Sequence, residues 1–388
     1  MTGIVIVAAR RTPQGRFLGA LSKRSAVDLA VAAGRAALSG IPADAIDQVI
    51  LGNVLSAGSG MNIARQVALT LGLPQRTPAF TVNMMCASGM QAVILAAQAI
   101  RAGEADVVLC GGSESMSQAP HVLTRARTGY RLGDGQVVDT LLRDGLVDPQ
   151  SGEHMGLTAE RVATLHGVSR ADQDAFAARS QAAYAEAAAA GRFAAELAPI
   201  DGLTVDEHPR ADATSAQLAS LKPAFAADGT VTAGNAAGIN DGAAMLVVCS
   251  DVAASRYGWP ILARARVWAA VGCDPAVMGL GPVHAVARLQ ERHGLDLASC
   301  DTVEINEAFA AQALACARLL DLKPERINRD GGAIALGHPI GASGARLIVH
   351  LAQRTAAGNS ERSLAALCVG GGMGVAMLIE SAAGSRSR

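Results

Sequence analysis

The chain has 388 residues, which is long enough for two or three domains. Hydrophobic residues make up 50% of it and charged residues only 17%, a composition typical of a well-buried α/β protein and not of a disordered one. Aromatic residues are scarce at 3% and the net charge is −1, so we do not expect a nucleic acid as the main partner.

The first third of the sequence alternates between apolar strands and amphipathic helices. Ser25, with Asp28 three residues later, is a typical N-cap and first-turn acid, and Gly40 ends the helix that follows. This alternation predicts a mostly parallel sheet covered on both faces. The expected elements are a strand at 4–9, a helix at Ser25–Leu38, a strand at Gln48–Val54, a helix at Asn62–Leu71 and a strand at Asp106–Cys110.

The middle of the chain has a different composition. Residues 118–155 are polar and rich in turn formers, and a long alanine-rich helix is expected at Ala171–Ala190, capped by Ser169. We therefore predict an inserted loop domain over 118–240. The N-terminal α/β half then comprises 1–117 plus 241–260, and the C-terminal α/β half comprises 261–388.

Strands and helices alternate again in the C-terminal part. The expected elements are strands at Met245–Cys249, Ile261–Val271 and Thr302–Ile305, and helices at Val283–His293 and Ala308–Leu320.

The sequence contains an internal repeat. Residues 83–100 can be laid on residues 338–355 without a gap, and the triplet ASG opens an apolar helix in both copies, at 87–89 and 342–344. Two copies of one α/β unit, packed about a pseudo-twofold axis, would bring Cys86 and His338 together.

Cys86 stands where a strand turns into a helix. Ala87, Ser88 and Gly89 follow it, and such small residues allow a sharp turn. A helix N-terminus carries a partial positive charge, so we expect this position to favour the thiolate. The alternative is an ordinary buried cysteine.

Three further polar residues lie at strand ends or glycine turns. Asn306 follows a strand, His338 lies in GHPIGASG, and Cys368 precedes a run of glycines. Each has an ordinary alternative, as a helix cap, a loop histidine or a packed strand cysteine. Together they suit acyl transfer: one thiol attacks, the imidazole takes its proton, the second thiol exchanges a proton with carbon, and N–H groups bind oxyanions. Cys86 and His338 alone would also fit a thiol protease.

Several blocks in the same order resemble the thiolase family, the acetyl-CoA acetyltransferases and 3-ketoacyl-CoA thiolases. The likeness runs from Ile4 to about Glu380. The blocks are VNMMCASGMQAV around Cys86, GGSESMS at 111–117, HMG at 154–156, GNAAGINDGAA at 234–244, NEAFA at 306–310, GGAIALGHPIGASGAR at 331–346 and CVGGGMG at 368–374.

The resemblance implies a thiolase-like fold, in which two similar α/β halves, each a five-stranded sheet between helices, carry an inserted loop domain that binds coenzyme A. It implies that Cys86 is the acylated nucleophile and His338 its base. Cys368 would be the acid/base that moves the acetyl proton. Asn306 would orient a water that forms one oxyanion hole with His338, and the N–H groups of Cys86 and Gly370 would form the other.

The resemblance also implies a site for coenzyme A. Arg210 matches a position near the adenosine phosphate, and Phe225 matches one near the pantetheine end. His154 and Met155 match the short-chain pattern, in which Met155 limits the acyl pocket. Ala237 replaces the usual serine of GNASG, which removes one hydrogen bond to the pantetheine arm, about 0.5–1.5 kcal/mol. Glu153 stands where short-chain members often have a tyrosine, and CASGMQ lies between the variants of the two classes.

We therefore expect an acyltransferase that makes acetoacetyl-CoA from two acetyl-CoA molecules, or cleaves 3-ketoacyl-CoA with coenzyme A. Coenzyme A thioesters are its substrates, without a metal or redox cofactor. The main alternative is a degradative 3-ketoacyl-CoA thiolase of β-oxidation with a wider pocket. A ketosynthase would use a second histidine in place of Asn306, and a non-catalytic acyl-CoA-binding relative would lack Cys86 or Cys368.

The remaining expectations concern location and assembly. The N-terminus lacks the features of a signal peptide, and no apolar run reaches the ~20 residues of a membrane span. Seven cysteines without a CxxC pair suggest neither a disulfide framework nor a zinc site. We expect a cytoplasmic enzyme of fatty acid metabolism without a membrane or nucleic-acid partner. The family implies a homotetramer, a dimer of dimers, while a simple dimer stays open.

Overall fold

The computed structural model describes residues 2–382. Residue 1, in the predicted N-terminal half, and residues 383–388, in the predicted C-terminal half, lie outside this range. The helices are α1 (Ala26–Ala37), α2 (Ile63–Thr70), α3 (Ser88–Ala102), α4 (Met155–Leu165), α5 (Arg170–Ala189), α6 (Ser215–Ala219), α7 (Asp251–Tyr257), α8 (Gly281–His293), α9 (Ala310–Leu319), α10 (Ala333–Leu336) and α11 (Ile340–Ala356).

The strands build one large sheet and one small hairpin. They are β1 (Ile4–Arg11), β2 (Gly15–Arg16), β3 (Gln48–Gly52), β4 (Ala79–Val82), β5 (Val107–Ser115), β6 (His121–Val122), β7 (Val138–Asp139), β8 (Asn240–Ser250), β9 (Ala263–Gly272), β10 (Thr302–Ile305), β11 (Arg362–Val369) and β12 (Met373–Glu380).

The large sheet is mixed, so the prediction of a mostly parallel sheet is wrong. Its order is β10-β11-β12-β9-β1-β8-β5-β3-β4. Only the pairs β3–β4, β3–β5 and β10–β11 are parallel, while the others run antiparallel. One cause is the glycine turn at 370–372, where Gly371 and Gly372 have left-handed φ angles and β11 returns directly as β12.

The two halves repeat the same pairing pattern. In the first half β3 is parallel to β5, and β8 and β1 follow antiparallel; in the second half β10 is parallel to β11, and β12 and β9 follow antiparallel. The equivalent of β4 is reduced to a single bridge between Val303 and Ile327. The halves are joined where β1 meets β9 over two residue pairs. The predicted internal repeat is thus visible in the strand topology.

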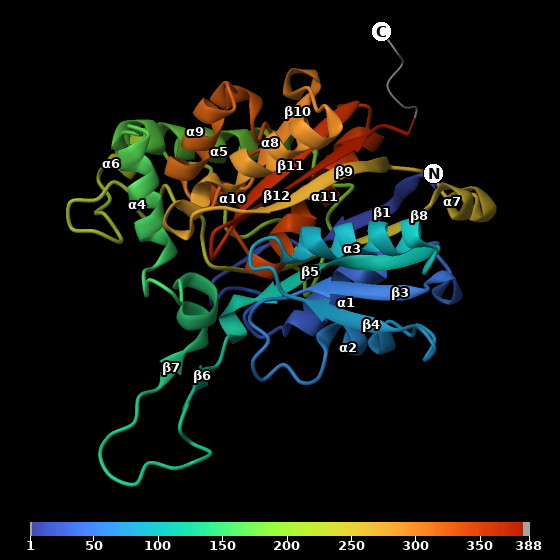
Figure 1. The fold of residues 1–388 in the computed structure, drawn as a ribbon, viewed down its shortest axis with the longest axis horizontal. Coiled ribbons are helices and arrows are strands. Elements are labelled where there is room, and N and C mark those ends of the chain that lie inside the picture. The colour runs from blue at the N-terminus through green and yellow to red at the C-terminus, as the bar shows by residue number, and fades with distance from the viewer. Residues whose placement is uncertain (1, 383–388) are drawn as a thin grey trace.

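Helices α3 and α11 pack against each other in the middle of the molecule, while α1 and α2 cover the first half of the sheet and α8 and α9 the second (Figure 1). Their crossing depends on glycine. A Cβ on Gly89 would lie 2.8 Å from the backbone nitrogen of Ala345, and one on Gly344 would lie 2.6 Å from that of Met90. The two contacts are equivalent under the repeat, so each ASG glycine lets its helix approach the other closely.

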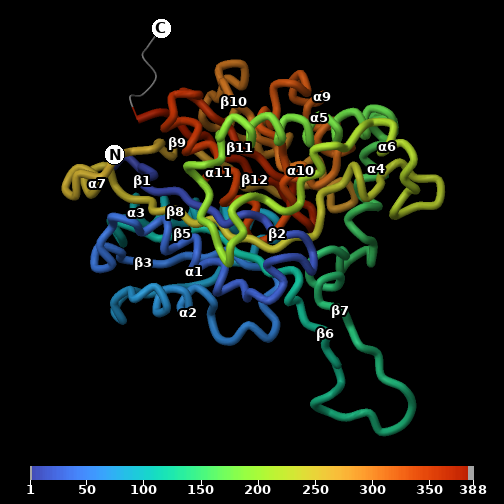
Figure 2. The backbone as a smooth tube through the Cα atoms, turned by 180° about the vertical axis from the view of Figure 1, so that it is seen from behind, coloured from blue at the N-terminus to red at the C-terminus, as the bar shows by residue number. Residues whose placement is uncertain are grey.

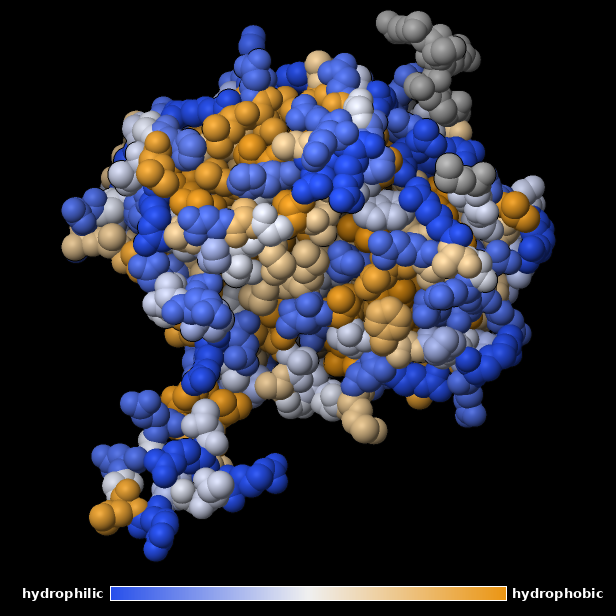
Figure 3. Space-filling model, in the orientation of Figure 1, coloured by the Kyte–Doolittle hydropathy of each residue, from blue (hydrophilic) through white to orange (hydrophobic). Residues whose placement is uncertain are grey.

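Between β5 and β8 the chain leaves the sheet and forms α4, α5 and α6 with long connections. The first part of this insertion, around β6 and β7, projects from the body in both views of the backbone (Figures 1 and 2). Figure 3 shows this projection as mainly hydrophilic, with hydrophobic atoms at its far end and its base. Within residues 2–382 no helix combines the length and apolar character needed to cross a membrane.

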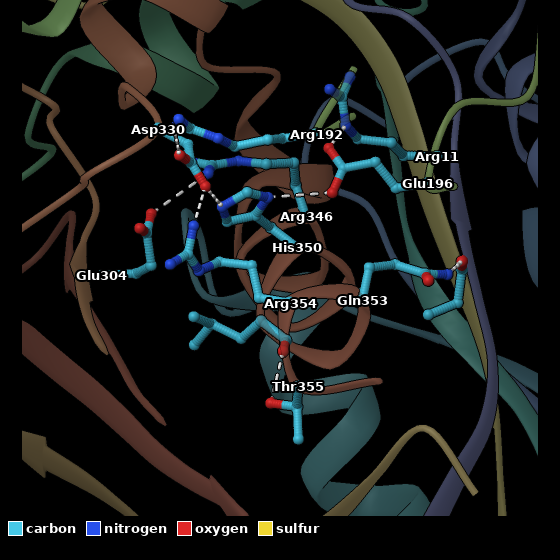
Figure 4. A network of polar contacts seen from close by, with 12 residues as sticks. Arg11, Arg192, Glu196, Glu304, Asp330, Arg346, His350, Gln353, Arg354 and Thr355 are labelled. Atoms are coloured by element: carbon cyan, nitrogen blue, oxygen red, sulfur yellow. Dashed lines mark hydrogen bonds and ion pairs between the residues drawn. The ribbon is translucent and has the colours of Figure 1, made fainter. Parts of the chain in front are cut away.

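The insertion also contributes Glu196 and Arg192 to a buried charge network on one side of α11 (Figure 4). His350 lies between Glu196, 3.0 Å from its Nδ1, and Asp330, 3.3 Å from its Nε2. Arg11 pairs with Glu196 at 2.6 Å, and Arg192 and Arg354 pair with Asp330. Buried charges are tolerated only when they are paired in this way.

Candidate active site

A cavity of about 610 Å³ opens where the two halves meet the insertion. Ten site residues were predicted from the sequence, and eight of them line this cavity. Asn306 and Cys368 do not line it. The eight are Cys86, His154, Met155, Arg210, Phe225, Ala237, His338 and Gly370.

Cys86 is presented by a strained turn between β4 and α3. Met85, immediately before it, has a left-handed φ of 47°, which is costly for a side chain of this size. Ser88 holds the turn, since its Oγ accepts from the Met84 N–H at 2.9 Å and donates to the Met85 carbonyl at 2.6 Å. The strain therefore falls on a methionine, where the sequence suggested that small residues would take the turn.

The expectation that this position favours the thiolate is wrong for the resting protein. Burial raises the pKa of Cys86 to about 11, and the N–H groups of Gly370 and of Cys86 itself offset this only in part. The loss of water around the sulfur outweighs the helix terminus. Cys86 is consequently a thiol at neutral pH and needs a base when it attacks.

His338 is held by partners from two sides. Its backbone N–H donates to Asn240 Oδ1 at 3.0 Å, and its Nδ1 lies 2.6 Å from Ser343 Oγ. The Ser343 hydroxyl donates to the Pro339 carbonyl at 2.9 Å, so its oxygen accepts from His338. This network assigns the proton to Nδ1 and leaves Nε2 as a free acceptor.

The imidazole is neutral at physiological pH. Burial, together with the charge of Arg346, lowers the pKa of His338 to about 4. A neutral ring with a free Nε2 can take the proton of a thiol.

Asn306 is completely buried behind His338. Its Nδ2 lies 3.5 Å from His338 Nδ1, which is too long to bind it firmly, and both atoms are donors in the assigned tautomer. Its Oδ1 has no partner among the residues that the structure describes. The amide can therefore bind a further group beside the imidazole.

Cys368 and Gly370 lie on the other side of Cys86, where β11 ends. Cys368 is fully buried, and both burial and the neighbouring Cys86 raise its pKa well above the ordinary value. The Gly370 N–H reaches the Cys86 sulfur. Cys86 and the Gly370 N–H thus meet at the inner end of the cavity, and the Cys368 thiol lies buried behind them.

Aromatic rings and methionine form the apolar wall. The ring of His154 stacks on Phe225 at 4.7 Å, and Phe225 meets Phe309 edge-on at 6.2 Å. Met155 is buried beside Gly370, since a Cβ on that glycine would lie 3.7 Å from the Met155 sulfur. His154 Nδ1 accepts from the Gly156 N–H at 3.0 Å, which fixes the ring at the start of α4.

Arg210 and Ala237 lie along the outer part of the cavity. Arg210 is exposed, and its backbone N–H donates to Gln181 Oε1 at 2.8 Å. Ala237 donates its N–H to the Ala308 carbonyl at 3.0 Å, so its own backbone links the insertion to the second half. The cavity therefore runs from a cationic surface residue to the Cys86 thiol.

Sequence reasoning missed the residues that orient the catalytic candidates. Ser88 and Ser343 are the central residues of the two ASG triplets, and each fixes the turn before its own helix. Their equivalence was available as a signal in the repeat. Asn240, which binds the His338 backbone, gave no such signal because it lies 98 positions away.

Two family models cover nearly the whole chain. The model described as thiolase, N-terminal domain, matches residues 4–252, and that described as thiolase, C-terminal domain, matches residues 259–381. The acetyl-CoA acetyltransferase of Pseudomonas aeruginosa is 48% identical over 98% of this chain and 99% of its own length. One from Escherichia coli is 49% identical, with the same two shares covered.

Solved structures give the same result. Human mitochondrial 3-ketoacyl-CoA thiolase superimposes with a TM-score of 0.95 at 43% identity, covering 98% of this chain and 99% of that one. The acetyl-CoA acetyltransferase of Bacillus anthracis has a TM-score of 0.95 at 42% identity, with the same coverage.

Proposed function

Because the chain belongs to the thiolase family, we propose that it condenses two acetyl-CoA molecules to acetoacetyl-CoA and cleaves 3-ketoacyl-CoA in the reverse direction. The observation that carries this proposal is the meeting of Cys86 from one half and His338 from the other in a single cavity. A structure of the human relative was determined in complex with CoA, which supports a coenzyme A thioester as the substrate.

In the first step the Cys86 thiol attacks the acyl carbonyl. His338 Nε2 takes the thiol proton and passes it to the departing coenzyme A thiol, leaving an acyl-Cys86 thioester. The N–H groups of Cys86 and Gly370 stabilise the oxyanion of the tetrahedral intermediate. The high pKa of the resting thiol makes this proton transfer necessary.

In the second step Cys368 gives its thiol proton to His338 Nε2, and the resulting thiolate removes a proton from the methyl group of a second acetyl-CoA. The protonated His338 and a water held by Asn306 stabilise the enolate oxygen, and the enolate carbon attacks the acyl-Cys86 carbonyl. Acetoacetyl-CoA forms, Cys86 leaves as the thiol with the proton that His338 returns, and Cys368 keeps the methyl proton as a thiol. Thiolysis follows the same steps in reverse, with Cys368 returning the proton to carbon. No metal or redox cofactor enters these steps.

We assign the acyl pocket to short chains, because Met155 closes the space beside Gly370. Arg210 would bind a phosphate of coenzyme A at the surface, while Phe225 and the Ala237 segment hold the pantetheine arm. The alternative is a degradative thiolase of broader chain length.

Steady-state thiolysis of acetoacetyl-CoA and of a longer 3-ketoacyl-CoA separates the two assignments. We expect kcat/KM to favour acetoacetyl-CoA. Met155→Ala should enlarge the pocket and raise activity on the longer substrate relative to the short one, whereas Met61→Ala, at an exposed methionine, should change neither. Equal or better activity of the unmodified enzyme on the longer substrate would favour the degradative alternative.

Assembly and location complete the proposal. A homotetramer is supported by the projecting segment around β6 and β7, which exposes Leu123, Leu132 and Val137, and by hydrophobic atoms on the face where α3 runs (Figure 3). A cytoplasmic site in fatty acid metabolism is supported by the chemistry, since Cys86 and Cys368 must both stay reduced.

A further inference from the structure

Glu114, at the end of β5, is a fully buried carboxylate close to Cys86. Four hydrogen-bond donors surround it. Its Oε1 accepts from Asn53 Nδ2 at 2.7 Å and from the Leu55 N–H at 3.0 Å. Its Oε2 accepts from the Val54 N–H at 3.0 Å and from the Gly341 N–H at 2.9 Å. Burial raises the pKa of Glu114 to about 7, while the N–H groups of Leu55, Val54 and Gly341 act against burial and favour the ionised carboxylate.

The fourth donor belongs to the opposite half of the molecule. Gly341 is the second residue of α11, so its N–H has no partner within the helix. A Cβ at this position would lie 2.7 Å from Glu114 Oε2, which means that only glycine leaves room for the carboxylate. Glu114 therefore caps α11 from across the boundary between the halves, and the helix dipole favours its charge.

The cap is linked to both the candidate base and the candidate nucleophile. Gly341 is three residues after His338, and no flexible segment separates them, since Pro339 is the N-cap of α11. Under the repeat Gly341 is the counterpart of Cys86. The charge of Glu114 also acts on Cys86, where it adds to the effect of burial in raising the thiol pKa.

We propose that Glu114 is a positioning residue for the thiolase reaction, whose carboxylate fixes the first turn of α11 and so sets His338 against Cys86. This inference rests on the proposed function. Glu114 itself touches neither the substrate nor the reacting atoms. Its charge has a second, smaller consequence, because it adds to the effect of burial, which keeps Cys86 protonated until His338 takes the proton.

The test compares Glu114→Gln and Glu114→Asp in the full chain. Gln keeps the size but presents an N–H₂ group to backbone donors, and it removes the charge. A displacement of about 1 Å can cost roughly 100-fold in rate, so we expect kcat for acetoacetyl-CoA thiolysis to fall by about that factor, with KM changed less than about threefold. Asp keeps the charge on a shorter arm, and we expect an intermediate loss of about tenfold.

Alkylation of Cys86 by iodoacetamide provides a second readout. Near pH 9.5 hydroxide forms the thiolate without help from His338. There we expect about threefold faster alkylation in Glu114→Gln, because a neighbouring negative charge is gone, and an unchanged rate in Glu114→Asp. Asp301→Asn is the matched control, since Asp301 also accepts two backbone N–H groups, from Glu361 and Arg362, but lies outside the cavity. It should leave both readouts unchanged.

The proposal is overturned if folded Glu114→Gln keeps kcat within about twofold of the unmodified enzyme. It is also overturned if kcat and KM worsen together while alkylation is unchanged, which indicates general loosening of the fold. If Glu114→Gln does not fold, Glu114→Asp decides by the same kcat and KM criteria. An unmodified enzyme that cleaves no 3-ketoacyl-CoA would refute the proposed function, while the alkylation comparison would still test the charge of Glu114.

Discussion

Helices α3 and α11 are equivalent under the internal repeat, yet their surroundings differ. Nearly every residue of α11 is buried, whereas α3 leaves Gln98 and Ala102 exposed and Gln91 and Leu95 half-buried. On α11 the matching side is covered by the insertion and the charge network around His350 (Figure 4). The molecule thus covers one helix with its own chain and leaves the other free.

The starts of the two helices also differ, since one faces the cavity and the other is bound by a buried side chain. Before α3 the thiol of Cys86 faces the cavity and receives the Gly370 N–H. At the equivalent point of α11, Gly341 carries no side chain and its N–H is bound by Glu114. One copy of the turn has been kept open for a substrate and the other has been closed by a carboxylate. The two similar turns therefore have different roles: the turn before α3 presents the nucleophile, and the turn at the start of α11 rigidly supports the base.

The largest expected effect concerns the two thiols, which come from different halves. Cys368→Ala should still accept an acyl group on Cys86 but lose condensation by roughly 10³-fold or more, because proton removal from carbon has no base. Single-turnover acylation and steady-state condensation, measured side by side, check this. Cys300→Ala, at a buried cysteine outside the cavity, is the control. Near-normal condensation in Cys368→Ala would contradict the division of roles.

The next effect concerns the covered side of α11. Burial opposes the charge on His350, but Glu196 and Asp330 outweigh it and raise the pKa of His350 to about 9. Because this folded-state pKa lies above the unfolded value near 6.5, the stabilisation is present at pH 6 and is lost as pH rises through about 9.

We therefore expect His350→Gln to lower the free energy of unfolding by about 3–5 kcal/mol at pH 6, since two buried carboxylates lose their partner. The deficit should shrink toward pH 10. Denaturant titrations at the two pH values measure it, with His293→Gln at the exposed end of α8 as the control. An equal deficit at both pH values would show that His350 is not charged in the folded protein.

The smallest expected effect concerns the free side of α3. Leu95→Arg places a charge on this face and should weaken self-association about tenfold while leaving the monomer folded. Light scattering over a dilution series checks this, with Leu165→Arg at a 64% exposed leucine as the control. Equal dilution behaviour of the two variants would mean that subunits meet through another surface.

Local sequence signals predicted the helices and strands well, but they did not predict the features that depend on contacts between distant segments. Ser25 and Ser169 form capping boxes with Asp28 and Asp172, and both helices begin as the sequence indicated. The repeat correctly placed Cys86 and His338 in one cavity. The antiparallel return of β12, the left-handed Met85 and the network around His350 were not predictable, because each depends on contacts between distant segments. For the same reason, the helix N-terminus suggested that Cys86 is a thiolate, whereas burial keeps it a thiol.

The central claim is that Cys86 carries the acyl group, and trapping the intermediate tests it most directly. The protein is mixed with acetyl-CoA and quenched in acid, and its intact mass is measured by mass spectrometry. It is then digested to locate the modification. We predict that one acetyl group is found on Cys86 of the unmodified enzyme and that Cys86→Ala takes up none. Acetylation of Cys86→Ala at another residue, or an unmodified enzyme that stays unacetylated while it turns over, would contradict the account.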